Sequence, residues 1–195
     1  MNDCVLAAYF HSLYTFAEFS KDKQLSVSCA INLRRHMKEL QNVGLTNHIA
    51  WMQCRIPKCG ADMAETLRLT VESTQRFKQD KYMGLHGLPL LNLAYKIMPY
   101  TIAEKVIRIG YSNPYIAMSN IGILDAESLT LNGLVPMDVF MSGAVKYKPF
   151  ILLTVTTYGE ELTLSMCVRG MDQDKEIVQR FLELMEQNIR NVCDF

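Results

Sequence analysis

Histidine is the first residue type to consider as a catalytic base, and this chain contains four: His11, His36, His48 and His86. None belongs to an H-x-x-x-D, H-E-x-x-H or H-x-H pattern. The chain also lacks the G-x-S-x-G, Walker and G-x-G-x-x-G motifs, which position nucleophiles or phosphates. His86 lies between glycines and could border a cavity, whereas His11 and His36 are expected to be satisfied or solvated. The side chains alone therefore contain no complete catalytic set.

Two pairs of charged residues could act on a substrate. Asp125 and Glu127 could share acid–base work, but a polar loop is the favoured interpretation. Arg34 and Arg35 follow a strand, and two adjacent guanidiniums suit bidentate binding of a carboxylate or phosphate. They can equally fix a loop by pairing with an internal acid, and this structural role is preferred.

The cysteines raise the question of metal binding. Cys54-x4-Cys59, with His48 upstream, could form half of a zinc site, but the spacing differs from the usual x2 knuckle and no second pair follows. The alternative is that cysteines serve as small apolar residues in strands and helices. We therefore predict no metal ligands and no disulfide framework among the six cysteines, which are Cys4, Cys29, Cys54, Cys59, Cys167 and Cys193.

The composition narrows the class of protein. The 195 residues are enough for one domain with its own core. Twenty acidic and twenty basic residues cancel, which argues against a basic nucleic-acid binder. No apolar stretch is long enough to span a membrane, and the chain start does not resemble a signal peptide. We expect a cytoplasmic protein with reduced cysteines.

The hydrophobic pattern predicts an α/β (α+β) fold in which helices flank one mixed sheet. Val135 to Val145 also alternates apolar and mixed residues, and Gly159-Glu160 suits a type II′ hairpin turn. We expect a single domain over residues 1–195, with helices over 3–19, 61–80, 90–98, 100–109 and 173–190 and strands over 25–33, 47–56, 115–122, 150–158 and 161–168.

Four segments, in order, resemble one family. Asn2-Asp3 precedes an alanine-rich helix, and residues 30–35 form a strand that ends in N-L-R-R, followed by Asn42-Val43-Gly44. Residues 118–122 give a strand-end S-N-I-G, and Pro149-Phe150 introduces the hairpin of residues 152–165. Together they resemble the C-terminal half of the condensation-domain superfamily, with the alcohol acetyltransferase-like branch closest.

The resemblance implies a chloramphenicol acetyltransferase-like half. In this superfamily two such halves face each other across a tunnel, and the base is a histidine of an H-H-x-x-x-D-G motif in the N-terminal half. That motif is absent from this sequence. The resemblance therefore implies a C-terminal, tunnel-forming subdomain that is inactive alone and carries no catalytic residue of its own. A non-catalytic binding or oligomerisation module on the same fold is the alternative.

The resemblance also assigns supporting roles. Asn2 and Asp3 would cap the first helix near the tunnel, Arg34 would hold an interface loop, and Ser119 and Asn120 would lie at the tunnel, where an amide could bond substrate. It implies an acyl-CoA or acyl-carrier thioester as co-substrate and no covalently bound cofactor. The expected partner is an N-terminal half or a second copy, and we expect exposed apolar surface where it would bind.

Overall fold

The computed structural model describes residues 2–16, 20–37, 47–110, 114–144 and 151–193. All expected helices and strands are present within these ranges, with ends that differ by a few residues. The helices are α1 (Asn2–Phe16), α2 (Met63–Gln79), α3 (Leu88–Ile97), α4 (Tyr100–Gly110) and α5 (Lys175–Cys193), and the strands are β1 (Leu25–Asn32), β2 (Ile49–Ile56), β3 (Ile116–Leu124), β4 (Ile151–Tyr158) and β5 (Glu161–Val168). Short 3-10 turns η1 (Leu33–His36), η2 (Glu127–Leu129) and η3 (Asp172–Asp174) complete the described elements.

The five strands form one mixed sheet in the order β2-β1-β3-β4-β5. β3 runs parallel to both β1 and β4, and the two outer pairs are antiparallel. Gly159, in the turn that joins β4 to β5, has φ +58°, which agrees with the predicted hairpin turn. The predicted class, a mixed sheet flanked by helices, is confirmed.

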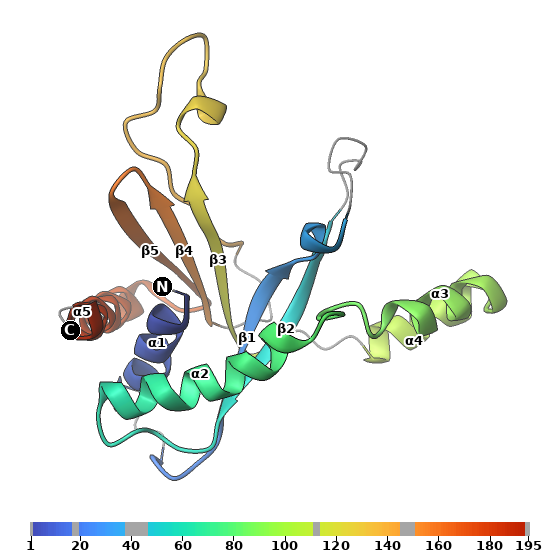
Figure 1. Cartoon of the computed structure of the whole chain (residues 1–195), viewed down its shortest axis with the longest axis horizontal. Helices are drawn as coiled ribbons and strands as arrows, with labels where there is room; N and C mark the ends of the chain where they lie inside the picture. The colour runs from blue at the N-terminus through green and yellow to red at the C-terminus, as the bar shows by residue number, and fades with distance from the viewer. Residues whose placement is uncertain (1, 17–19, 38–46, 111–113, 145–150, 194–195) are drawn as a thin grey trace.

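Three helices, α1, α2 and α5, pack on the same face of this sheet (Figure 1). The middle of α1 is buried all round, because the sheet, α2 and α5 surround it. Tyr9 and Phe16 of α1 both meet Phe181 of α5 edge-to-face, with ring centroids 6.0 Å and 5.5 Å apart, a geometry that aromatic pairs prefer. Asn188 Nδ2 donates to Ser12 Oγ over 2.9 Å, so α5 is held to α1 by a buried polar bond as well.

Threonines line the side of α2 that faces α1. Thr66, Thr70 and Thr74 are completely buried. Ala7 and Ala8 of α1 are also inaccessible, and they pack with Met63. Small side chains on both helices allow the two backbones to approach closely, which explains a pattern that apolar periodicity alone does not predict.

The alternation over Val135 to Val145 does not form a strand in the part that the structure describes, and Val145 itself lies outside it. The chain instead crosses the face of β4 that points away from the helices. Thr154 Oγ1 donates to the Met141 carbonyl over 2.8 Å, and the Met141 N–H donates to Thr156 Oγ1 over 3.0 Å. Because side chains of β4 satisfy this backbone, a neighbouring strand is not needed to pair with it.

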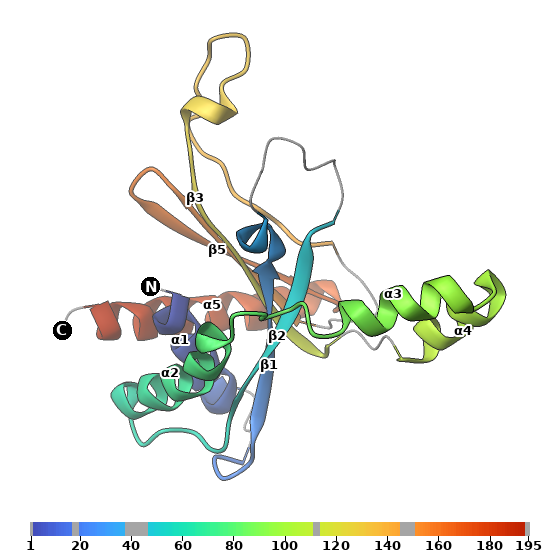
Figure 2. The same cartoon turned by 45° about the vertical axis from the view of Figure 1, so that its right-hand side comes forward.

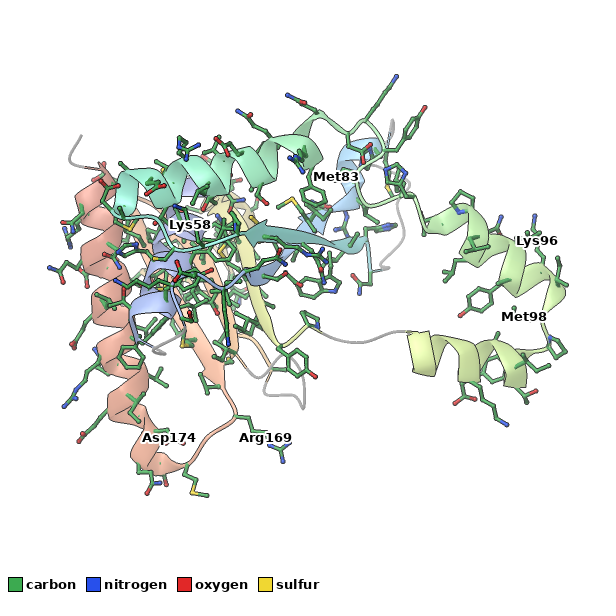
Figure 3. The ribbon with its side chains drawn as sticks, turned by 90° about the horizontal axis from the view of Figure 1, so that it is seen from below. Lys58, Met83, Lys96, Met98, Arg169 and Asp174 are labelled. Atoms are coloured by element: carbon green, nitrogen blue, oxygen red, sulfur yellow. The ribbon has the colours of Figure 1, made fainter. Side chains whose placement is uncertain are left out.

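Helices α3 and α4 form an arm that extends away from the sheet and the other helices (Figures 1 and 2). Lys96 and Met98 lie toward the far end of this arm in Figure 3. No residue of α3 is buried. Within the described residues, no helix is both long enough and apolar enough to cross a membrane.

Candidate functional site

A pocket of about 250 Å³ opens between the start of α1 and the irregular part of β3. It brings together Asn2 and Asn120, two of the residues that the sequence assigned to the tunnel. The complete lining is Asn2, Cys29, Ala30, Met118, Asn120, Ile121 and Gly122.

A β-bulge places the side chain of Asn120 in this pocket. The register between β3 and β4 shifts between Asn120 and Gly122, and Gly122 has φ +82°, a conformation that a side chain would oppose. Asn120 Oδ1 accepts from the Gly122 N–H over 2.8 Å, and its Nδ2 donates to Asn2 Oδ1 over 3.1 Å. The bulge therefore links β3 to the first turn of α1, across 118 positions of sequence.

Ser119 and Asp3 are adjacent in sequence to the pocket residues but do not line the pocket. Ser119 is paired with Thr154 in the sheet register. The Asp3 carboxylate accepts from Thr74 Oγ1 over 3.1 Å and forms an ion pair with Lys78. α1 includes Asn2 and Asp3, and their side chains tie it to β3 and α2; the capping role assigned to them stays a prediction.

Arg34 lies in η1, apart from the pocket. Its backbone N–H donates to Asn32 Oδ1 over 3.0 Å, and its carbonyl accepts from the Met37 N–H. Asn32 therefore caps this turn. The Arg34 side chain is half-buried. The side chain of Arg35 lies outside the described residues, so the hypothesis of a two-guanidinium site stays a prediction.

Three of the histidines lie outside the pocket, where each contacts another residue. His36 Nε2 bonds the carbonyl of Met83 over 2.9 Å, so it joins η1 to the segment after α2 rather than remaining solvated as expected. His86 Nε2 lies 2.5 Å from Asp80 Oδ2, and this contact is the main reason why the pKa of Asp80 is lowered. His11 Nδ1 is 3.1 Å from Thr66 Oγ1.

His11 also lies near a cysteine, but the pair is not set up for nucleophilic catalysis. Thr66 donates its hydroxyl proton to the carbonyl of Asp62, so the His11 Nδ1 must donate to Thr66 and cannot accept a proton from the Cys59 thiol 3.8 Å away. Burial raises the pKa of Cys59, which opposes thiolate formation. Burial, reinforced by Lys21, lowers the pKa of His11 and favours its neutral form.

The acidic pair and the cysteines also have structural partners. Asp125 accepts from the Glu127 N–H over 3.2 Å and from Ser128 Oγ over 2.6 Å, so it caps η2. These two bonds lower the pKa of Asp125, and the bond from Ser128 contributes the most. Cys54 Sγ donates to Ser73 Oγ over 3.3 Å, and burial raises the pKa of Cys54 to about 11.

The zinc hypothesis is not supported by this geometry. In the described chain, no group of three His, Cys, Asp or Glu side chains is placed to hold a metal. Cys54 faces α2, Cys59 faces His11, and the backbone of His48 accepts from the Leu33 N–H. The two cysteines therefore fit the alternative, small buried residues at packed positions.

Comparisons with known proteins identify the fold. No protein-family model matches the sequence, and no curated protein matches it. Solved structures do match. The epimerization domain from the third module of tyrocidine synthetase B superposes with a TM-score of 0.64 at 14% identity, over 100% of this chain and 42% of that one.

Two acyltransferases show the same relationship. The trichothecene 15-O-acetyltransferase from Fusarium sporotrichioides gives a TM-score of 0.66 at 14% identity, over 96% of this chain and 40% of that one. The wax ester synthase/diacylglycerol acyltransferase from Marinobacter aquaeolei gives a TM-score of 0.55 at 17% identity, over 97% of this chain and 41% of that one.

The chain therefore has the fold of one part of the condensation-type domains and acyltransferases. It spans about two-fifths of the length of these structures. This confirms the fold that the sequence motifs implied. Sequence reasoning missed the remaining pocket residues Cys29, Ala30, Met118, Ile121 and Gly122. The one available signal was a glycine within a strand, which often marks a bulge.

Proposed function

We propose that this chain is the tunnel-forming half of an acyltransferase that moves an acyl group from a thioester, on CoA or a carrier protein, to a hydroxyl or amine. The fold that it shares with acyltransferases supports this proposal, as does the span of about two-fifths of their length. In this proposal a second half supplies the opposite wall of the tunnel and the catalytic base.

The chemistry of the Asn2–Asn120 pocket is the observation that carries the proposal. Its polar side chains are two amides, which can hydrogen-bond a substrate but cannot remove a proton at neutral pH, and the thiol of Cys29, whose pKa burial raises. Among the described residues, no histidine or carboxylate lines it. Attack on a thioester requires a base near the acceptor hydroxyl or amine, so the base would come from the partner half, and the chain alone would be inactive.

The direct test mixes this chain with a separate polypeptide that carries the H-H-x-x-x-D-G motif and follows thiol release from acyl-CoA in the presence of an alcohol. That polypeptide is the product of coding sequence upstream of this chain. The mixture is expected to release thiol, and neither part alone should do so. Turnover by residues 1–195 alone would overturn the proposed inactivity.

Two variants connect this activity to the pocket. Asn120→Ala removes the pocket amide and is expected to lower kcat/KM of the mixture about tenfold, the effect of one lost hydrogen bond. Asp125→Asn changes a carboxylate that only caps η2 and should leave kcat/KM unchanged. If Asp125→Asn abolished turnover while Asn120→Ala did not affect it, the Asp125–Glu127 acid–base hypothesis would replace this one.

The second candidate is a non-catalytic binding or oligomerisation module. It is favoured by the apolar side chains that the arm exposes, including Leu90 and Ile97 at 72% and 71%. Light scattering distinguishes the two proposals: a stable oligomer that does not bind the motif-bearing polypeptide favours the module, and a one-to-one complex favours the acyltransferase half.

A further inference from the structure

The two edges of the sheet differ in how their outward backbone groups are satisfied. The Leu33 N–H donates to the His48 carbonyl over 2.8 Å. In an antiparallel ladder, residues that bond the neighbouring strand alternate with residues whose backbone groups point outward, so this bond sets which residues of β2 do which. Ile49, Trp51, Gln53 and Arg55 of β2 therefore direct their N–H groups away from β1.

Side chains cap both ends of this β2 edge. The Ile49 N–H donates to Asn47 Oδ1 over 3.2 Å, and the Arg55 N–H donates to Ser73 Oγ of α2 over 3.0 Å. Such local partners are one way in which proteins prevent an edge strand from pairing with another chain. Two of the four outward N–H groups of β2 are thus already satisfied, one at each end of the strand.

The β5 edge has no such protection. The two-residue turn at Gly159 and Glu160 pairs Tyr158 with Glu161. From this pair on, residues of β5 that bond β4 alternate with residues whose backbone groups point outward, without a register shift. The residues that direct N–H and C=O groups away from β4 are Leu162, Leu164, Met166 and Val168. Within the described chain, these groups have no partner beyond the sheet. β5 also contains no proline, lysine or bulge, the usual devices that block an edge.

A groove runs beside this open edge, between β5 and α5. It consists of two hollows of about 570 Å³ and 700 Å³ that meet at Gln179. Figure 1 shows β5 at the outer side of the sheet with α5 beneath it. Its apolar lining comes from both elements and from Met171 between them, and consists of Leu162, Leu164, Met166, Val168, Met171, Val178, Leu182 and Ile189.

The rim of this groove is acidic. Its two cations are already paired, Lys175 with Asp172 at 3.0 Å and Arg190 with Glu186 at 2.7 Å. Three further carboxylates in the lining, Glu160, Glu183 and Asp174, have no ion pair within the described residues. Asp174 is the last residue of η3, directly before α5 (Figure 3). Negative charge therefore follows the groove along its length.

We propose that the β5–α5 groove binds an extended basic peptide, which adds to the sheet as a sixth strand beside β5. The outward N–H and C=O groups of β5 would supply the backbone bonds, as in other cases of strand addition. Lysine or arginine stems would cover the apolar lining while their charged ends reach Glu160, Glu183 and Asp174. A second copy of this chain fits less well, because it would bring the same acidic rim against the groove.

The test uses a fluorescein-labelled heptapeptide that alternates lysine with valine and threonine. Fluorescence anisotropy is expected to show saturable binding that weakens with salt. A peptide of the same sequence with alternate backbone amides methylated keeps the charge but cannot pair as a strand, and it is expected to bind at least about tenfold more weakly. Equal binding of the two peptides would overturn the strand-addition proposal.

Variants of α5 test the contribution of charge. Glu183→Lys is expected to weaken binding about threefold to tenfold, because it replaces attraction with repulsion. Glu176→Lys makes the same charge change on the same helix outside the groove and should have little effect. An equal effect of the two variants would show nonspecific attraction and would contradict the proposal.

Hydrogen exchange then locates the bound peptide. The peptide is expected to slow exchange of the amides of Leu162, Leu164, Met166 and Val168, and to leave the β2 edge unchanged. Protection at β2 instead of β5 would overturn the assignment. Protection at β5 that rises with protein concentration in the absence of peptide would show pairing with a second copy, which also overturns it.

Discussion

At the scale of single residues, the contact between Asn2 and Asn120 shows how the pocket is held. One side-chain bond of 3.1 Å connects the first turn of α1 to the bulge in β3. A double-mutant cycle of Asn2→Ala and Asn120→Ala is expected to give a coupling energy of about 0.5–1 kcal/mol, modest because the bond is exposed to solvent.

Urea unfolding of the parent, the two single variants and the double variant measures this coupling. Asn120→Ala should cost more than Asn2→Ala, since it also removes the acceptor for the Gly122 N–H. Additive effects of the two substitutions would show that the contact contributes nothing to stability.

His11 makes the stability of the protein depend on pH. Its pKa is lowered from the ordinary 6.5 by burial first and by Lys21 second, while Asp62 opposes the shift. Below about pH 6.5 the unfolded chain therefore binds more protons at this site than the folded chain, and the free energy of unfolding falls as the pH decreases. The lowered pKa values of Glu65, Asp80 and Asp125 act at more acidic pH.

Urea unfolding at pH 5.5 and pH 7.5 tests this effect. The parent is expected to be less stable at pH 5.5, and His11→Gln, which retains a donor toward Thr66, should reduce the difference. A variant with the same pH dependence as the parent would show that other groups cause it.

At the scale of elements, the close packing of α1 on its neighbours leaves no room for a larger side chain. Ala8 is inaccessible and packs in a cluster with Met63 of α2 and Ile189 of α5. Ala8→Leu is expected to reduce the free energy of unfolding by about 2 kcal/mol through overpacking. Ala64→Leu, at an exposed position of α2, is the matched control and should change it little. Equal values for the two variants would contradict this packing.

The elements also show how far the sequence predicts this structure. Periodicity correctly places elements that have a buried side, such as β1 with Val27, Cys29 and Ile31, and it also places α3, although none of the α3 residues is buried. The alternation over residues 135–144 does not produce a strand, and side chains of β4 bond the backbone of Met141 there. In the pocket, Asn2 and Asn120 were predicted through a family resemblance. Cys29 was not predicted, because the lining of a pocket depends on which strands become neighbours, and the local sequence pattern does not determine that.

At the scale of the whole molecule, the arm is notable for the apolar side chains that it exposes. In its described part, α3 exposes Leu90 to 72% and Ile97 to 71%, and Tyr100 in α4 is 76% exposed. The sequence predicted such apolar surface for a half without its counterpart, and the structure confirms that it is exposed. Exposed apolar patches of this kind usually mark binding surfaces or sites of aggregation.

A charge-neutral double variant tests whether the arm drives association. Leu90→Glu with Ile97→Lys should weaken self-association about tenfold in sedimentation velocity, since two apolar side chains no longer gain from burial. Thermal stability should stay the same, because neither side chain contributes to the core. Leu131→Glu with Leu134→Lys makes the matching change in the segment after η2, where these leucines are 76% and 74% exposed. If only this second variant became monomeric, the segment after η2, and not the arm, would be the surface that the partner covers.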